Sequence, residues 1–136
     1  MKVALTIAGA DPSGGAGIQA DLKVFRSLGI YGLSATASLT AQNSAGVKDL
    51  MPVSSGFLER QVSVLMEDFR PDAIKTGMLY SEDNVKVVAK ILDRYSLENF
   101  VIDPVMVSSS GRRLTEKAAQ RAIREKLLHR LWVSEK

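Results

Sequence analysis

The chain has 136 residues, of which 46% are hydrophobic and 24% charged, a composition typical of one globular domain. A formal net charge of +3 is too small to indicate a nucleic-acid-binding surface, and no apolar stretch approaches the ~20 residues that a membrane helix requires. The chain has no cysteine and one histidine, which excludes metal sites built from thiolates or from several histidines. From the composition as a whole we expect a cytoplasmic protein without nucleic-acid or membrane partners.

The first half of the chain alternates apolar runs with amphipathic segments. A short apolar run predicts a buried strand at 3–8, ending at Gly9. Apolar residues at helical spacing then predict a helix over 18–28, and small and β-compatible residues predict a strand over 31–39. A second amphipathic helix is predicted over 57–69, where Pro71 closes it.

The second half repeats the alternation. Strands are predicted over 72–76 and 100–102, and helices are predicted to follow caps at Ser81 and Thr115. Strands that alternate with helices are typical of a three-layer α/β fold, in which a mostly parallel sheet carries helices on both faces. Ligands of such sheets bind beyond the carboxyl ends of the strands. Four segments follow predicted strands, and we expect them to converge on one rim: 9–17, 40–43, 77–78 and 103–106.

The glycines of the first of these segments, Gly14, Gly15 and Gly17, raise the question of a phosphate site. No Gly-Lys-Ser/Thr is present, so the loop is not a Walker A motif, and the loose G-x-G-x-x-A match lacks an acid after the second strand to bind a ribose. A tight turn needs one or two glycines, whereas three indicate a close approach to the backbone. Asp21 lies one turn inside the helix and is interpreted as a surface acid near the helix N-terminus on these grounds alone.

Four stretches carry a resemblance to a known family. "TIAGADPSGGAGIQADLKVF", "SLGIYGLSATASLTAQNS", "IKTGML" and "VIDPVMVSSSGRRL" closely resemble the hydroxymethylpyrimidine and phosphomethylpyrimidine kinases of thiamine biosynthesis, which have a ribokinase-like fold. The similarity extends over about 3–128, nearly the whole chain. It implies ATP- and Mg²⁺-dependent phosphorylation of 4-amino-5-hydroxymethyl-2-methylpyrimidine and then of its monophosphate.

The resemblance also implies which residues form a pyrimidine site. Gln42 would hydrogen-bond the aminopyrimidine edge, since an amide both donates and accepts. Gly9 would allow the ring to approach the backbone, and Asp21 would hold the hydroxymethyl group or nearby polar atoms. Lys75 and Asn43 are weaker candidates.

Apolar contacts and a metal ligand complete the implied site. Met78, Val105 and Met106 would pack against the ring, although Met78 is equally compatible with a place in the core. Asp103 would lie near Mg²⁺ and the phosphates as an oxygen ligand, with a turn cap before Pro104 as the alternative.

The resemblance implies a chain that corresponds to an N-terminal half. The family's second half carries a Thr-Pro-Asn segment, most of the ATP site and a Gly-Thr-Gly-Cys loop with the catalytic cysteine, and none of these occurs here. We therefore expect residues 1–128 to form part of a truncated ribokinase-like domain, with 129–136 as a divergent tail after a frameshift. Alternatives remain open: a non-catalytic pyrimidine-binding remnant, one half of a split kinase, a pyridoxal-kinase-like protein or an unrelated nucleotide-binding module. An exposed apolar face predicts a homodimer or a partner chain.

Overall fold

The computed structural model describes residues 1–105 and 111–128, and these form a sheet with helices on both faces. The elements in chain order are β1 (Val3–Gly9), α1 (Gly17–Ser27), β2 (Tyr31–Asn43), β3 (Gly46–Pro52), α2 (Ser55–Asp68), β4 (Ala73–Thr76), α3 (Glu82–Arg94), β5 (Phe100–Ile102), α4 (Lys117–Ala122) and a π-helical turn, η1 (Ile123–Leu127).

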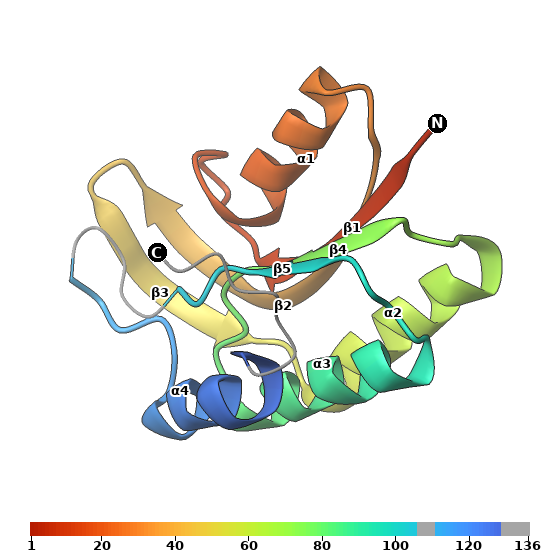
Figure 1. Cartoon of the computed structure of the whole chain (residues 1–136). Helices are drawn as coiled ribbons and strands as arrows, with labels where there is room; N and C mark the ends of the chain where they lie inside the picture. The colour runs from red at the N-terminus through yellow and green to blue at the C-terminus, as the bar shows by residue number, and fades with distance from the viewer. Residues whose placement is uncertain (106–110, 129–136) are drawn as a thin grey trace.

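The described strands form one five-stranded sheet in the order β3-β2-β1-β4-β5. The pairs β1–β2, β1–β4 and β4–β5 are parallel, whereas β2–β3 is antiparallel. Helix α1 lies on one face, and α2, α3 and α4 lie on the other (Figure 1). The predicted three-layer, mostly parallel α/β fold is confirmed.

Alternation along β1 explains how both faces are covered. Leu5 and Ile7 are fully buried and belong to the core with Leu58 of α2 and Val88 of α3. Thr6 points to the opposite face and hydrogen-bonds α1 through Asp21. A central parallel strand is buried on both sides, which is why 3–8 is almost continuously apolar.

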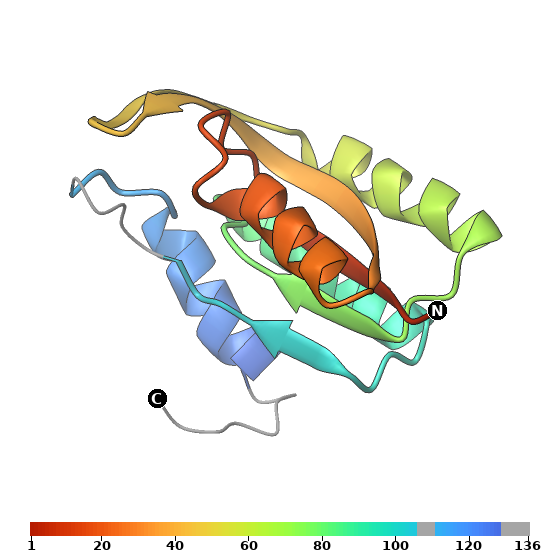
Figure 2. The same cartoon turned by 90° about the horizontal axis from the view of Figure 1, so that it is seen from above.

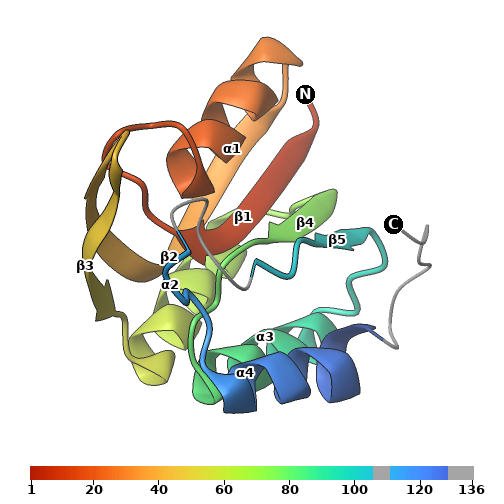
Figure 3. The ribbon, with the colours of Figure 1, turned by 90° about the vertical axis from the view of Figure 1, so that its left-hand side faces the viewer.

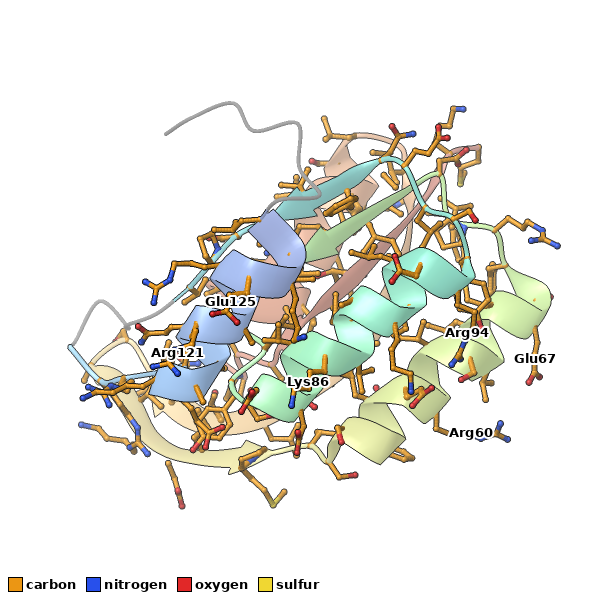
Figure 4. All side chains as sticks on the ribbon, turned by 60° about the horizontal axis from the view of Figure 1, so that its bottom comes forward. Arg60, Glu67, Lys86, Arg94, Arg121 and Glu125 are labelled. Atoms are coloured by element: carbon orange, nitrogen blue, oxygen red, sulfur yellow. The ribbon has the colours of Figure 1, made fainter. Side chains whose placement is uncertain are left out.

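The outer side of the α2–α3–α4 layer faces solvent and is charged. The labelled side chains of Arg60, Lys86, Arg121 and Glu125 extend away from the sheet (Figure 4). Glu59 joins the first two helices of this layer, since Oε1 lies 2.9 Å from the guanidinium of Arg94. Exposed pairs of this kind contribute little to stability, so the apolar interior of the layer holds it on the sheet.

The second strand is longer than predicted, and one strand was not predicted. Residues 40–43 were expected to follow a strand that ends at 39, but β2 continues through them and pairs antiparallel with β3. Strand β3 itself was not predicted, because most of its residues are exposed or half-buried and give no apolar pattern. The hairpin extends the sheet past the carboxyl end of β1, as the side view shows (Figure 3).

The last helix also begins differently from the prediction. Thr115 was expected to cap it, but α4 begins at Lys117 with Glu116 at the capping position. The Thr115 hydroxyl instead donates to the carbonyl oxygen of Val105 at 2.5 Å. The Ser81 cap is confirmed, because its hydroxyl accepts from the amide of Asn84 at 3.2 Å.

Candidate functional site

A cavity of about 400 Å³ lies at the carboxyl ends of the parallel strands. All four segments that were expected to converge contribute to it, so this prediction is confirmed for the described residues. Seen from above, the loop that precedes α1 lies near the β2–β3 hairpin at the same end of the sheet (Figure 2). The lining residues are Ala8, Gly9, Ala10, Asp11, Ala16, Gly17, Ala20, Asp21, Thr40, Gln42, Val47, Lys75, Gly77, Met78, Asp103, Val105 and Leu114.

The glycine-rich loop folds around the carboxylate of Asp11, which is only 3% exposed. Oδ1 accepts from the amide and hydroxyl of Ser13 at 2.8 and 2.6 Å, and Oδ2 accepts from the amides of Gly15 and Ala16 at 3.0 and 2.8 Å. Burial by itself would raise the pKa of Asp11, but these hydrogen bonds outweigh it and lower the pKa below its ordinary value of 3.8.

This arrangement explains why the loop is not a phosphate cradle. A phosphate would need the loop amides that already donate to Asp11, and it would meet the negative charge of that carboxylate. The close approach predicted from the glycines occurs within the protein itself. Gly17 has φ of +61°, and a Cβ there would overlap the carbonyl oxygen of Gly9.

Gly9, at the end of β1, is crowded on one side. A Cβ at this position would overlap the Sδ-methyl carbon of Met78 and would lie 2.8 Å from Oγ of Ser38. Met78 is buried, which fits a place in the core, and it also lines the cavity, so its contact with the ring stays a prediction. Gly9 is itself buried and lines the cavity, and a side chain at this position would displace Met78 and Ser38.

Asp21 is held in an ion pair rather than standing at the surface. Its Oδ1 and Oδ2 lie 3.0 and 2.9 Å from Nζ of Lys75, and Oδ2 also accepts from the Thr6 hydroxyl at 2.7 Å. The Asp21 and Lys75 side chains are 17% and 24% exposed. The interpretation of Asp21 as a surface acid was therefore wrong. Sequence reasoning missed Thr6 and ranked Lys75 low.

Gln42 reaches the cavity from the extended part of β2. Its Nε2 donates to Oγ1 of Thr40 at 2.8 Å, and that hydroxyl donates to the carbonyl oxygen of Ala10 at 2.9 Å. Asn43 lies elsewhere: its Oδ1 accepts from the amide of Ala45 in the hairpin turn, and it does not line the cavity. The amide of Gln42 is thus held through its nitrogen at the wall of the cavity.

Asp103 and Val105 form the opposite side of the cavity, after β5. The amide of Asp103 donates to the carbonyl oxygen of Thr76 at 2.8 Å, and Asp103 itself is exposed. Met106, predicted to pack against the ring, lies outside the described residues. Within residues 1–105 and 111–128, no group of three or more metal-ligating side chains occurs. One exposed carboxylate fits an ion that arrives with ATP, because Mg²⁺ is usually held by one or two carboxylates and the substrate phosphates.

The comparisons with known proteins agree with this geometry. A family model described as phosphomethylpyrimidine kinase matches residues 11–134. The chain belongs to this family. The hydroxymethylpyrimidine/phosphomethylpyrimidine kinase of Bacillus subtilis is 43% identical over 127 residues, which are 93% of this chain and 47% of that protein. The chain therefore spans about half the length of the curated relatives that it matches.

Two solved kinase structures are similar to this chain in both fold and sequence. The phosphomethylpyrimidine kinase of Clostridium difficile superposes with a TM-score of 0.86 at 39% identity, covering 93% of this chain and 55% of that one. The pyridoxal kinase of Staphylococcus aureus, in complex with AMP-PCP and pyridoxal, gives a TM-score of 0.80 at 36% identity, covering 94% and 45%. The ribokinase-like assignment is confirmed. No helix in the part of the chain that the structure describes is long and apolar enough to cross a membrane.

Proposed function

We propose that this chain forms the pyrimidine-binding part of an ATP-dependent hydroxymethylpyrimidine/phosphomethylpyrimidine kinase. The observation that carries the proposal is that Gly9, Asp21, Gln42, Met78, Asp103 and Val105, chosen from the family motifs, all line one cavity. In this proposal Gln42 binds the aminopyrimidine edge and the apolar side chains of Met78 and Val105 contact the ring. Asp103 takes part in holding Mg²⁺, which arrives as Mg-ATP and neutralises charge on the phosphates.

The chain's own contribution to catalysis is positioning. Phosphoryl transfer depends on orientation and on electrostatic stabilisation of the transferred group, and the motifs implied to hold ATP and the catalytic cysteine do not occur in the 136 residues. We therefore propose binding without efficient turnover by this chain alone. A cytoplasmic location and association with a second copy or a partner chain remain predictions.

A kinase assay tests this proposal directly. The 136-residue chain and the full-length Bacillus subtilis relative are given hydroxymethylpyrimidine and Mg-ATP, and phosphorylated product is measured. We expect turnover by the relative and at most about one-thousandth of that rate from the chain alone, because loss of several catalytic groups is not compensated by binding. A comparable rate would refute the proposed division of roles.

The likeness to pyridoxal kinase supports a second candidate ligand. A TM-score of 0.80 to a complex with pyridoxal shows that this fold also accommodates a hydroxylated pyridine. Titration of the chain with hydroxymethylpyrimidine and with pyridoxal discriminates the two. If pyridoxal binds more tightly than hydroxymethylpyrimidine, pyridoxal becomes the proposed ligand.

A further inference from the structure

The ion pair between Lys75 and Asp21 is the part of the cavity that the motif comparison does not explain. Asp21 was expected to touch the ligand, but both its oxygens are engaged within the protein, by Lys75 and Thr6. Lys75 is different. An ammonium group has three N–H donors, and its hydrogen bonds within the described residues both go to the one carboxylate of Asp21.

The register of the sheet places Lys75 for a contact with a ligand. Lys75 pairs with Thr6 across β1 and β4, so both side chains lie on the face that α1 covers, where Asp21 reaches them. From there the ammonium extends toward the carboxyl end of β4. It lies 3.2 Å from the position that a Cβ on Gly77 would occupy, and both residues line the cavity.

The strand order places Lys75 and Gln42 on different sides of the cavity. Gln42 comes from β2 and Asp103 follows β5, with β1 and β4 between them in the sheet. The oxygen-bearing substituent of the pyrimidine is on C5, next to the amino-bearing C4. A pyrimidine whose amino edge is bound by Gln42 and whose C5 side faces β1 and β4 would therefore direct this substituent toward Lys75. Lys75 offers only donors, which suits an oxygen atom and not an amino group.

We propose that Lys75 binds the oxygen of the ligand's hydroxymethyl or phosphomethyl substituent, and that Asp21 is a positioning residue that acts through Lys75. This inference rests on the proposed function and assigns the oxygen-binding end of the same cavity. Thr6 completes the support by fixing Oδ2 of Asp21. A phosphate oxygen would form a charge-assisted bond with the ammonium and gain more from it than a hydroxyl.

Calorimetric titration with three ligands tests the proposal: hydroxymethylpyrimidine, its monophosphate, and the analogue with a 5-methyl group that lacks the oxygen. We expect Lys75→Met to weaken the binding of hydroxymethylpyrimidine about 10- to 100-fold, the range for a hydrogen bond to a charged group. The binding of the monophosphate should weaken at least as much. The 5-methyl analogue should bind the wild type and Lys75→Met equally.

The positioning role of Asp21 is tested by non-additivity. We expect Asp21→Asn to weaken hydroxymethylpyrimidine in the wild type but to cause no further loss in the Lys75→Met background, because it acts through the ammonium. Asp21→Glu, which retains the charge, should recover part of the affinity. Equal losses in both backgrounds would overturn the positioning role and indicate a separate contact or a structural effect.

A matched control uses the ion pair of Glu82 and Lys86 on α3, where the atoms are 3.4 Å apart and the side chains are half-exposed. Lys86→Met should leave all three affinities unchanged. The double variant Asp21→Asn/Lys75→Met removes both charges and so avoids an unpaired charge that would oppose folding. Its thermal unfolding shows whether a loss of affinity occurs in a folded protein.

The outcomes separate this inference from the proposed function. If the wild type binds hydroxymethylpyrimidine and the folded Lys75→Met and double variants bind it equally well, Lys75 has no contact with the oxygen and only this inference fails. If Lys75→Met weakens the binding of the 5-methyl analogue as strongly as that of hydroxymethylpyrimidine, Lys75 does not contact the oxygen and the inference also fails. If the wild type binds none of the three ligands, both proposals fail.

Discussion

Replacing Asp11 with asparagine should destabilise the chain through the glycine-rich loop. The carboxylate accepts four hydrogen bonds, two on each oxygen, from Ser13, Gly15 and Ala16. Asparagine keeps one acceptor oxygen and presents an NH₂ group to the other pair of donors. Two bonds are then lost beside a buried group, at about 1–2 kcal/mol each, so we expect a loss of about 2–4 kcal/mol in the free energy of unfolding.

Urea denaturation followed by circular dichroism measures this change at two pH values. Hydrogen bonding lowers the pKa of Asp11 in the folded state, so its stabilising contribution is present above the unfolded value near 3.8 and is lost as the pH falls through the folded pKa. The difference between wild type and Asp11→Asn should therefore be large at pH 7 and shrink under strongly acidic conditions.

The control for this prediction is Asp68→Asn, at an exposed position that ends α2. An acid near a helix C-terminus is not favoured by the helix dipole, so this variant should be neutral or slightly stabilising. A loss below about 0.5 kcal/mol for Asp11→Asn would be within the range of surface substitutions and would refute the reasoning. An equal loss at both pH values would also refute it, because the effect would not depend on the carboxylate charge.

Three further predictions concern other parts of the fold. Gly17→Ala should lower the free energy of unfolding by more than about 1 kcal/mol in urea denaturation, because its Cβ would meet the carbonyl oxygen of Gly9 and the backbone φ is positive. The control Gly56→Ala lies in a helix with no atom near the new Cβ and should be neutral or stabilising. Equal effects of the two substitutions would contradict this reasoning. Asn84→Ala should lower the melting temperature, because its buried Nδ2 donates to the carbonyl oxygen of Leu79 at 2.9 Å; an unchanged value would show that the bond contributes nothing. Val101 is 63% exposed on β5, at the edge of the described sheet, so we expect the chain to self-associate and Val101→Lys to reduce this association. Sedimentation of the wild type as a clean monomer would contradict this prediction.

Local sequence patterns predicted most elements but not the contacts between them. Leucine, isoleucine and valine at strand or helix spacing identify β1, β4 and β5 and the helices α2 and α3, which contribute to the apolar core or pack against it. The same spacing identifies α1, although none of its residues is buried. Strand β3 has no such face. Its position depends on the hairpin turn that begins at Asn43, and the turn residues 43–46 were the available signal for it.

The interactions inside the cavity could not be predicted because they depend on register and on helix placement. Lys75 and Asp21 are far apart in sequence, and they meet because β4 pairs in register with β1 and α1 packs against β1 on the same face. The grouping of the motif residues was predictable from strand ends alone, since parallel strands finish at one edge. The bonds of Asp11 to its own loop were not, because four donors must be placed in three dimensions before the turn is visible.

The measurement that tests the central claim most directly is calorimetric titration of the 136-residue chain with hydroxymethylpyrimidine, in the wild type and in Gln42→Leu. We expect saturable binding of one pyrimidine per chain, weakened about tenfold or more by Gln42→Leu, because a buried hydrogen-bonding edge of the ligand loses its partner. Asn43→Ala, which changes the neighbouring amide outside the cavity, should bind like the wild type. No binding, or equal binding by Gln42→Leu, would show that this cavity is not the pyrimidine site.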